Sequence, residues 1–298
     1  MPHPRIGTCS WNYPSWEGLV YRQGQQPGPA LLREYATRFD CVEIDRWFWS
    51  LGRSGKAGLP SPSDAAAYRE AVGDGFRFAV KAPNALTLTH EYARRKDDPL
   101  VANPHFLSRS LLGEFLDRIE AMHDVLGPIL FQFEYLNRKK VPSRAAFLDQ
   151  VAAFARELPP GFTYGVEVRN PPWVDAEHLT LLKDVGLIPV LISGYWMPPL
   201  EELFERHRKQ LLGFDTIVLR LMGEDRGKIE ETTGKVWNRI VEPHDAELGA
   251  VAGILVSISR AGRTPFLFVN NHYEGCAPLT ITRLLDRLEA EIGAENPA

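Results

Sequence analysis

Short β-favouring runs that each end in a charged or polar residue recur along the chain. One run ends with Glu167 and Arg169, and the following segment Asn170–Trp173, which holds two prolines, stops the strand. Similar runs lead to Asp45, Lys81, Arg220 and Asn270. In a parallel barrel the carboxyl ends of the strands form one rim, and active sites of that architecture lie there. The pattern therefore predicts the location of a functional site, at the carboxyl ends of the strands, but not its function.

Strand and helix signals alternate from one end of the chain to the other. Strands are expected near residues 5–10, 41–45, 76–81, 128–133, 162–168, 187–192, 215–222 and 265–270. Each is followed by a segment long enough for a helix, as parallel strands require. Eight such units predict an α/β fold, a single (β/α)8 TIM-type barrel. We expect one domain over residues 1–298, because barrels of about 250 residues form a single domain.

Three helices carry signals of their own. Apolar residues from Leu107 to Leu126 recur mostly at three- and four-residue spacing, which predicts one amphipathic helix. Ser143 is expected to cap a second helix. A third begins at Asp175 and ends at Gly186.

Composition and charge narrow the class of protein. The chain has 298 residues, a hydrophobic fraction of 44% and a net charge of −4, which supply a core but no global attraction to nucleic acid or a membrane. The first strand begins at Arg5 and leaves no room for a signal peptide, and no apolar run approaches spanning length. We expect a cytoplasmic protein without a membrane partner. Cys9, Cys41 and Cys276 are odd in number and lack metal-ligand spacing, which predicts free thiols.

The two-residue period of a strand indicates which side chains face the barrel interior. If Glu43 points inward, Asp45 does too, and Glu167 and Arg169 pair in the same way. The expected ring is completed by Thr8, Ser10, Lys81, Gln132, Ser193, Arg220 and Asn270.

Six of the seven tryptophans fall in segments just after expected strands. They are Trp11, Trp16, Trp47, Trp49, Trp173 and Trp196. Such rings either stack on a sugar or nucleobase or plug the barrel mouth. We favour a ligand-binding mouth that includes Trp11 and Trp173, because a plug alone would not need so many charged residues beneath it.

Several motifs occur in order over nearly the whole chain. They are Gly7–Trp16, Val42–Asp45 with Phe48, Lys81–Ala82 with Leu88–His90, Leu126–Phe133, Val166–Arg169 with Trp173, Arg220–Gly223, and Asn270–Asn271 with Gly275 and Ala277. Together they resemble the DUF72 family, also called YecE-like proteins. The resemblance implies a TIM barrel and brings no reaction with it, so the function must be argued from the residues.

Several positions depart from the pattern of that family, and one departure is Glu134–Tyr135, which replaces a proline pair after the glutamine. Asp45 stands where an asparagine is usual, which would make this mouth more acidic than in its relatives. Met222 stands where an Arg-x-His-Gly motif has histidine. Any role of that histidine would be lost here or moved to His90 or His272.

Acid/base chemistry is the first hypothesis for the site. Glu43 and Glu167 lie on different strands of one ring, and as a carboxylate pair they would be the catalytic residues, one kept ionised near a cation and one raised in pKa under tryptophan. The alternative is a salt-bridged ring in which these glutamates and the neighbouring cations neutralise one another.

Anion binding is the second hypothesis. Lys81, Arg169 and Arg220 are expected to converge with Asn270 near the loops where barrels often hold phosphate. The chain has no Walker-type or dinucleotide fingerprint, and the sequence leaves any cofactor unknown. It has no ordered histidine or cysteine set, so no metal site is predicted. The basic runs Arg94–Lys96 and Arg138–Lys140 keep a nucleic-acid partner open without favouring it.

Together these observations favour an enzyme of hydrolase, lyase or isomerase type that acts by acid/base chemistry on a small anionic or sugar-like substrate. The catalytic candidates are Glu43 and Glu167. The substrate-binding candidates are Ser10, Trp11, Asp45, Lys81, Gln132, Arg169, Trp173, Arg220 and Asn270. A nucleic-acid-processing protein and a non-catalytic ligand-binding protein remain as alternatives.

Overall fold

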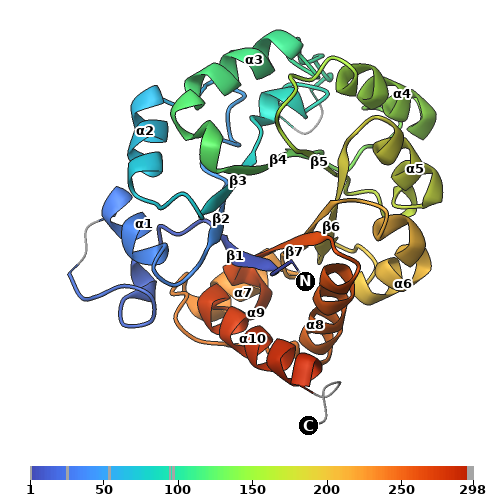
Figure 1. The fold of residues 1–298 in the computed structure, drawn as a ribbon. Helices are drawn as coiled ribbons and strands as arrows, with labels where there is room; N and C mark the ends of the chain where they lie inside the picture. Colours follow the sequence, from blue (N-terminus) through green and yellow to red (C-terminus); the bar gives the residue numbers. More distant parts are fainter. Residues whose placement is uncertain (1, 25–26, 53–54, 94, 96–97, 294–298) are drawn as a thin grey trace. The chain divides into compact units, whose positions relative to one another are not determined.

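Eight parallel strands form a closed barrel in the order of the sequence. The computed structural model describes residues 2–24, 27–52, 55–93, 95 and 98–293. The strands are β1 (Arg5–Cys9), β2 (Cys41–Ile44), β3 (Arg77–Lys81), β4 (Leu126–Gln132), β5 (Tyr164–Glu167), β6 (Ile188–Ser193), β7 (Thr216–Leu221) and β8 (Thr264–Val269) (Figure 1). The predicted (β/α)8 TIM-type fold is therefore confirmed, with each strand close to its predicted range.

Helices follow the strands along the chain. They are α1 (Pro29–Tyr35), α2 (Pro62–Glu70), α3 (Arg109–Arg118), α4 (Arg144–Ala155), α5 (Ala176–Asp184), α6 (Leu200–Leu211), α7 (Arg226–Thr233), α8 (Asp245–Arg260), α9 (Asn271–Glu274) and α10 (Ala277–Gly293). Ser143 and Asp175 cap α4 and α5 as predicted, each accepting a hydrogen bond from a backbone N–H three residues later. Among the described residues, no helix is both long and apolar enough to cross a membrane.

The helix expected from Leu107 to Leu126 is divided. Helix α3 ends at Arg118, and Ile119 has φ −108° and ψ 15°, outside the helical region. A 3-10 helix, Glu120–Val125, then leads into β4. The apolar residues stay buried across the break, so the hydrophobic pattern was preserved while the backbone changed from one helix type to another.

The described chain divides into two compact units. The first unit joins Met1–Glu43 with Pro189–Ala298, and the second is Ile44–Ile188. In the first unit β8 pairs with both β1 and β7, and α8 lies beside α10 (Figure 1). In the second unit β4 pairs with both β3 and β5. The single domain expected over residues 1–298 stays a prediction.

Aromatic packing shows which side chains of the second unit face the helices. Phe131 meets Phe154 of α4 with ring centroids 5.4 Å apart, and Phe133 meets Phe147 of the same helix at 4.9 Å. Gln132 lies between them in the strand and therefore points to the opposite face of the sheet. That is the inward direction predicted for it.

Two members of the expected ring point the other way. The Thr8 hydroxyl lies 2.9 Å from the hydroxyl of Tyr35 on α1, and the Ser193 hydroxyl donates a hydrogen bond to Glu247 on α8. Both side chains therefore face helices, and their predicted inward direction is wrong. In β1 it is Cys9 that is in register with Glu43, so the inward positions of this strand are shifted by one residue.

A buried histidine makes the stability of the fold depend on pH. His178 on α5 is 3% exposed, and burial, more than the nearby charge of Arg144, lowers its pKa to about 4. The unfolded chain, with an ordinary pKa of 6.5, binds a proton there that the folded chain excludes. The free energy of unfolding should therefore fall as the pH is lowered from 6.5 to about 4.

We expect His178→Leu to remove this contribution. The wild-type free energy of unfolding minus that of the variant, measured by urea denaturation, should shrink by about 3 kcal/mol between pH 7 and pH 4. Parallel pH profiles for the two proteins would contradict the neutral state assigned to His178.

Candidate functional site

A fully buried ion pair joins two strands of the first unit. Arg220 on β7 donates from Nε and Nη2 to the two carboxylate oxygens of Glu43 on β2, each at 2.7 Å. In the barrel order β8 and β1 lie between these strands, so the pair reaches across the interior instead of along neighbouring strands. Both predicted residues thus point inward and meet.

This pair constrains what Glu43 can do. Both side chains are 0% exposed. A bidentate carboxylate–guanidinium pair is among the strongest side-chain hydrogen-bond arrangements, and removing one partner leaves a buried charge. A carboxylate with no exposed surface does not touch a ligand arriving from solvent. The geometry therefore favours a positioning role for Glu43, and its assignment as a proton carrier stays an untested prediction.

Neighbouring strands of the second unit carry a second polar group, which we call the β3–β5 array. It consists of Lys81, Gln132, Glu167 and Arg169. Gln132 on β4 is in register with Glu167 on β5, and Lys81 on β3 is in register with the β4 residue two positions before Gln132. The array therefore lies at the carboxyl ends of three adjacent strands, where the sequence analysis predicted polar side chains to gather.

The ion pair in this array differs from the first in its exposure. Arg169 Nε donates to Glu167 Oε1 at 2.9 Å, and the side chain of Glu167 is 0% exposed while that of Arg169 is 19% exposed. The buried carboxylate thus holds a cation that still reaches solvent. Such a fixed guanidinium suits recognition of a carboxylate or phosphate.

An aromatic ring helps to hold the other cation of the array. The ammonium group of Lys81 lies 5.3 Å from the centroid of the Phe48 ring, in the loop after β2. This is within the range of a cation–π interaction. The Lys81 side chain is largely buried, and its contact with the Phe48 ring helps to fix it at the strand end.

The remaining polar candidates lie at strand ends but have different local roles. Ser10 follows β1 with φ 68°, and Asp45 follows β2; both are half-buried. Asn270 caps α9, because its side-chain oxygen accepts a hydrogen bond from His272 N at 2.9 Å. A capping role alone explains this asparagine, so its predicted contact with substrate stays a prediction.

The tryptophans do not form one wall. Trp11, Trp16 and Trp47 are buried, and Trp173 is half-buried with its ring centroid 5.3 Å from that of Phe147 on α4. Trp49 and Trp196 are instead 71% and 90% exposed. Most of these rings therefore contribute to packing, and only the exposed ones present a free face to solvent.

The sequence analysis missed a polar cavity in the first unit. A space of about 300 Å³ is lined by residues that include Ser193, Gly194, Gly223, His244, Glu247 and Tyr273. The hydroxyls of Ser193 and Tyr273 donate to the two carboxylate oxygens of Glu247, and burial raises the pKa of Tyr273. Glu247 lies in the first turn of a helix, so a search confined to strand ends overlooks it. The sequence feature that could have indicated this cavity is the pair of glycines that follow β6 and β7, Gly194 and Gly223.

The histidines named as replacements for the family histidine have other contacts. Met222 is buried. His272 Nε2 lies 3.1 Å from Glu230 Oε1, and burial is the main cause that lowers the pKa of His272. His90 Nδ1 lies 2.8 Å from the hydroxyl of Thr89. These contacts do not assign either histidine to the site.

Several other sequence features bear on cofactors and partners. All three cysteines are buried thiols outside any disulfide of the described residues, in line with the prediction. Within the described ranges, no group of three or more histidine, cysteine or acidic residues is placed to hold a metal ion. Of the two basic runs, Arg94 and Lys96 lie outside the described residues, Arg138 and Lys139 are exposed, and Lys140 pairs with Glu134.

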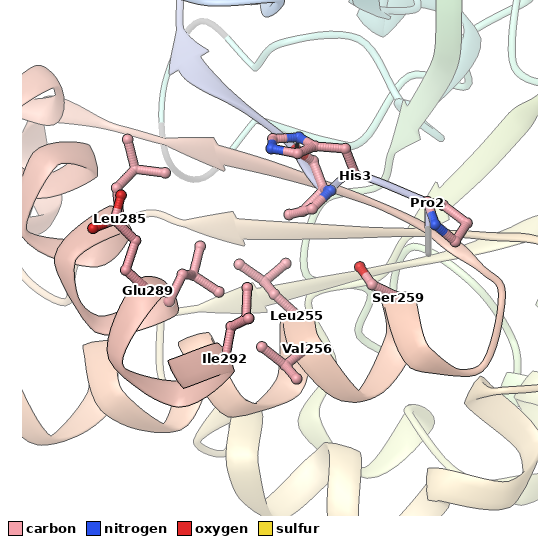
Figure 2. A pocket seen from close by; sticks show the side chains of 10 residues that line it. Pro2, His3, Leu255, Val256, Ser259, Leu285, Glu289 and Ile292 are labelled. Carbon is pink, nitrogen blue, oxygen red and sulfur yellow. Dashed lines mark hydrogen bonds between the residues drawn. The ribbon is translucent and has the colours of Figure 1, made fainter. Parts of the chain in front are cut away.

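A cavity of about 290 Å³ lies at the opposite, amino-terminal end of β1. Figure 2 shows that α8 and α10 line it mainly with aliphatic side chains, among them Leu255, Leu285 and Ile292, beside Pro2 and His3. That end of a TIM barrel serves stability, whereas catalytic residues lie at the carboxyl ends of the strands. We therefore place the candidate site at the carboxyl ends.

Comparisons with known proteins agree with this architecture. A family model described as "Protein of unknown function DUF72" matches residues 5–298. The chain is 32% identical over 167 residues to the UPF0759 protein YecE of Escherichia coli (strain K12), a match that covers 56% of this chain and 48% of that protein. The chain thus spans about half the length of the curated relative it matches.

Solved structures extend the likeness over the whole fold. A DUF72 family protein from Thermotoga maritima MSB8 has a TM-score of 0.65 and 20% identity, with 96% of this chain and 100% of that chain covered. One from Enterococcus faecalis V583 has a TM-score of 0.65 and 16% identity, with 96% of each chain covered. At these identities the likeness concerns the fold alone.

Losing one partner of the buried pair should destabilise the protein more than losing both partners. We expect Glu43→Gln to lower the free energy of unfolding by about 3 kcal/mol or more, because the buried guanidinium of Arg220 loses its bidentate ion pair with a carboxylate. The double variant Glu43→Leu with Arg220→Met should recover much of that loss, since both charges are gone. Urea denaturation of the single and double variants measures both effects; a single-variant loss below about 1 kcal/mol would match an exposed pair instead.

Proposed function

The chain belongs to the DUF72 family, and we propose that it binds a small molecule carrying a carboxylate or phosphate group at the carboxyl ends of β3, β4 and β5. One observation carries the proposal. A carboxylate with no exposed surface, Glu167, pairs with Arg169, whose side chain is partly exposed, beside two further polar side chains of the same array.

The donors of the β3–β5 array favour an anion as the ligand. Arg169 offers a guanidinium that Glu167 holds in place, and Lys81 offers an ammonium group at the end of β3. Gln132 adds an amide whose nitrogen can donate to an anionic oxygen. Because the cations are already held by Glu167 and by the Phe48 ring, little side-chain entropy is lost when a ligand binds.

Acid/base catalysis on such a ligand is a second candidate function. The array lies where enzymes of this architecture have their active sites, and Asp45 is a half-buried carboxylate at the end of β2. On this proposal Asp45 moves the proton in a hydrolase, lyase or isomerase reaction, while Glu167 positions Arg169. The burial of Glu43 and Glu167 in ion pairs supports a non-catalytic binding protein equally well, so turnover must be tested separately from binding.

Anion binding should depend on Arg169. We expect phosphate or citrate to raise the melting temperature of the wild-type protein, and Arg169→Met to weaken binding of the same anion at least about tenfold, because a charge-assisted hydrogen-bond donor is lost. The matched control is Arg206→Met, since Arg206 also pairs with a glutamate but lies on the surface of α6. Isothermal titration calorimetry gives the affinities. No binding to the wild type, or equal loss in the control, would reject the proposal.

Glu167→Gln separates positioning from proton transfer. If Glu167 positions Arg169, the variant should lose stability on the order of 3 kcal/mol and bind anions more weakly. If Glu167 carries the proton, anion affinity should stay intact while turnover of an identified substrate falls by about 10²-fold or more. Thermal melting, calorimetry and turnover are measured on the same preparation. Full activity per folded molecule in a destabilised variant would exclude the catalytic role.

A further inference from the structure

A cavity of about 260 Å³ in the second unit lies between the loop after β2 and the start of α2. Its lining consists of Arg46, Trp47, Trp49, Ser50, Gly58, Leu59, Pro60, Ser61 and Asp64. Ligand pockets commonly measure about 300–1,000 Å³, so this space suits a molecule of one ring better than a larger ligand. Three of the lining side chains, Trp49, Arg46 and Asp64, indicate the chemical class of that ring.

Trp49 is one of the residues that line this space. The residue is 71% exposed, although indole is among the side chains that gain most from burial. Its ring is fixed nonetheless, because it packs edge-on against Phe48 with centroids 5.1 Å apart. A ring that is held in place and left uncovered is suited to stack on a ligand that has its own flat apolar face.

Polar groups of opposite sign line the same cavity. Arg46 is exposed and Asp64 is half-buried. Arg46 Nη1 donates a hydrogen bond to the Tyr68 hydroxyl at 3.4 Å, which helps to place its guanidinium at the cavity, and Asp64 lines the same space. A guanidinium only donates hydrogen bonds and a carboxylate only accepts them. The pair therefore suits neighbouring hydroxyl groups, each of which both donates and accepts.

The floor and the loop of the cavity are preformed. Trp47 is buried beneath it and stacks on Tyr68 of α2 with centroids 5.6 Å apart. The side-chain oxygen of Asn84 accepts hydrogen bonds from the backbone N–H groups of Ser50 and Leu51, each at 2.9 Å. The loop that carries Trp49 is thus tied to the segment after β3, which lowers the entropy lost on binding.

We propose that this cavity is a sugar-binding subsite, in which a pyranose ring stacks on Trp49 and its hydroxyl groups bind Arg46 and Asp64. A pyranose has one face made of C–H groups and an edge of hydroxyls, which matches an indole beside a mixed-charge pair. A nucleobase would also stack on indole, but it offers no row of adjacent hydroxyl groups that could both accept from a guanidinium and donate to a carboxylate.

Phe48 connects this subsite to the anion-binding array. One side of its ring faces the ammonium of Lys81 and the ring also contacts Trp49. The inference deepens the proposed function and rests on it: the ligand is a sugar that carries a carboxylate or phosphate, with the ring on Trp49 and the anionic group toward Lys81 and Arg169. The β3–β5 array alone indicates only that the ligand is an anion. The Trp49 cavity adds that the ligand is a sugar.

Saturation-transfer difference NMR tests the subsite with methyl glycosides of glucose, galactose and N-acetylglucosamine, with methyl glucuronide and with adenosine. We expect at least one neutral glycoside to bind the wild-type protein and Trp49→Ala to weaken its binding about tenfold. Asp64→Asn should weaken it as well. Trp196→Ala is the matched control, because Trp196 is 90% exposed and does not line this cavity. Circular dichroism and melting temperature confirm that each variant is folded.

Binding of an anionic sugar tests the sugar subsite and the anion-binding array separately. Methyl glucuronide should bind more tightly than methyl glucoside, and Arg169→Met should remove that advantage without changing the affinity for the neutral glycoside. If the neutral glycoside binds through Trp49 but the glucuronide gains nothing from Arg169, the proposed anion site fails and the sugar subsite stands. The subsite is overturned if no glycoside binds at up to about 10 mM, if Trp196→Ala weakens binding as much as Trp49→Ala, or if only adenosine binds.

Discussion

The pair between Glu43 and Arg220 is the contact on which the interior of the first unit depends. Two charges without exposed surface face each other from β2 and β7, and each alone would be very costly to bury. Their bidentate hydrogen bonds offset much of that cost and fix both side chains. Two strands that are separated by β8 and β1 in the barrel order are thereby linked through the interior, with a polar contact where a hydrophobic core would otherwise continue.

The second unit also contains an ion pair with a buried carboxylate, but this pair differs in its exposure to solvent. Glu167 is as buried as Glu43, but its partner Arg169 keeps part of its surface in solvent. In the first pair both side chains are shielded from solvent, which suits a structural role. In the second pair the carboxylate is shielded but the arginine side chain stays partly accessible. This difference in exposure is why the proposed anion site lies at β3–β5, and why the nearby aromatic cavity with Trp49 extends that site toward a sugar ring.

Most of the backbone could be predicted because its signals are local. Short β-favouring runs that end in a polar residue gave the strands, and Ser143 and Asp175 marked helix starts that the structure contains. The division of the helix after Arg118 was not predicted, because the apolar spacing continues through it. Site residues were predicted at strand ends, yet Glu247 escaped notice because it reaches its cavity from the first turn of a helix.

The sequence by itself determined the barrel class, the positions of its strands and the polar residues at their carboxyl ends, because periodicity and strand-stopping residues act over short stretches. Only the tertiary structure decided which of these residues face one another and how much solvent they meet. Register is a relation between strands far apart in the chain, so Thr8 turned toward α1 and Glu43 toward Arg220. Exposure is likewise set by everything that packs around a side chain, which is why Trp47 is buried while Trp49, two residues later, stays open to solvent.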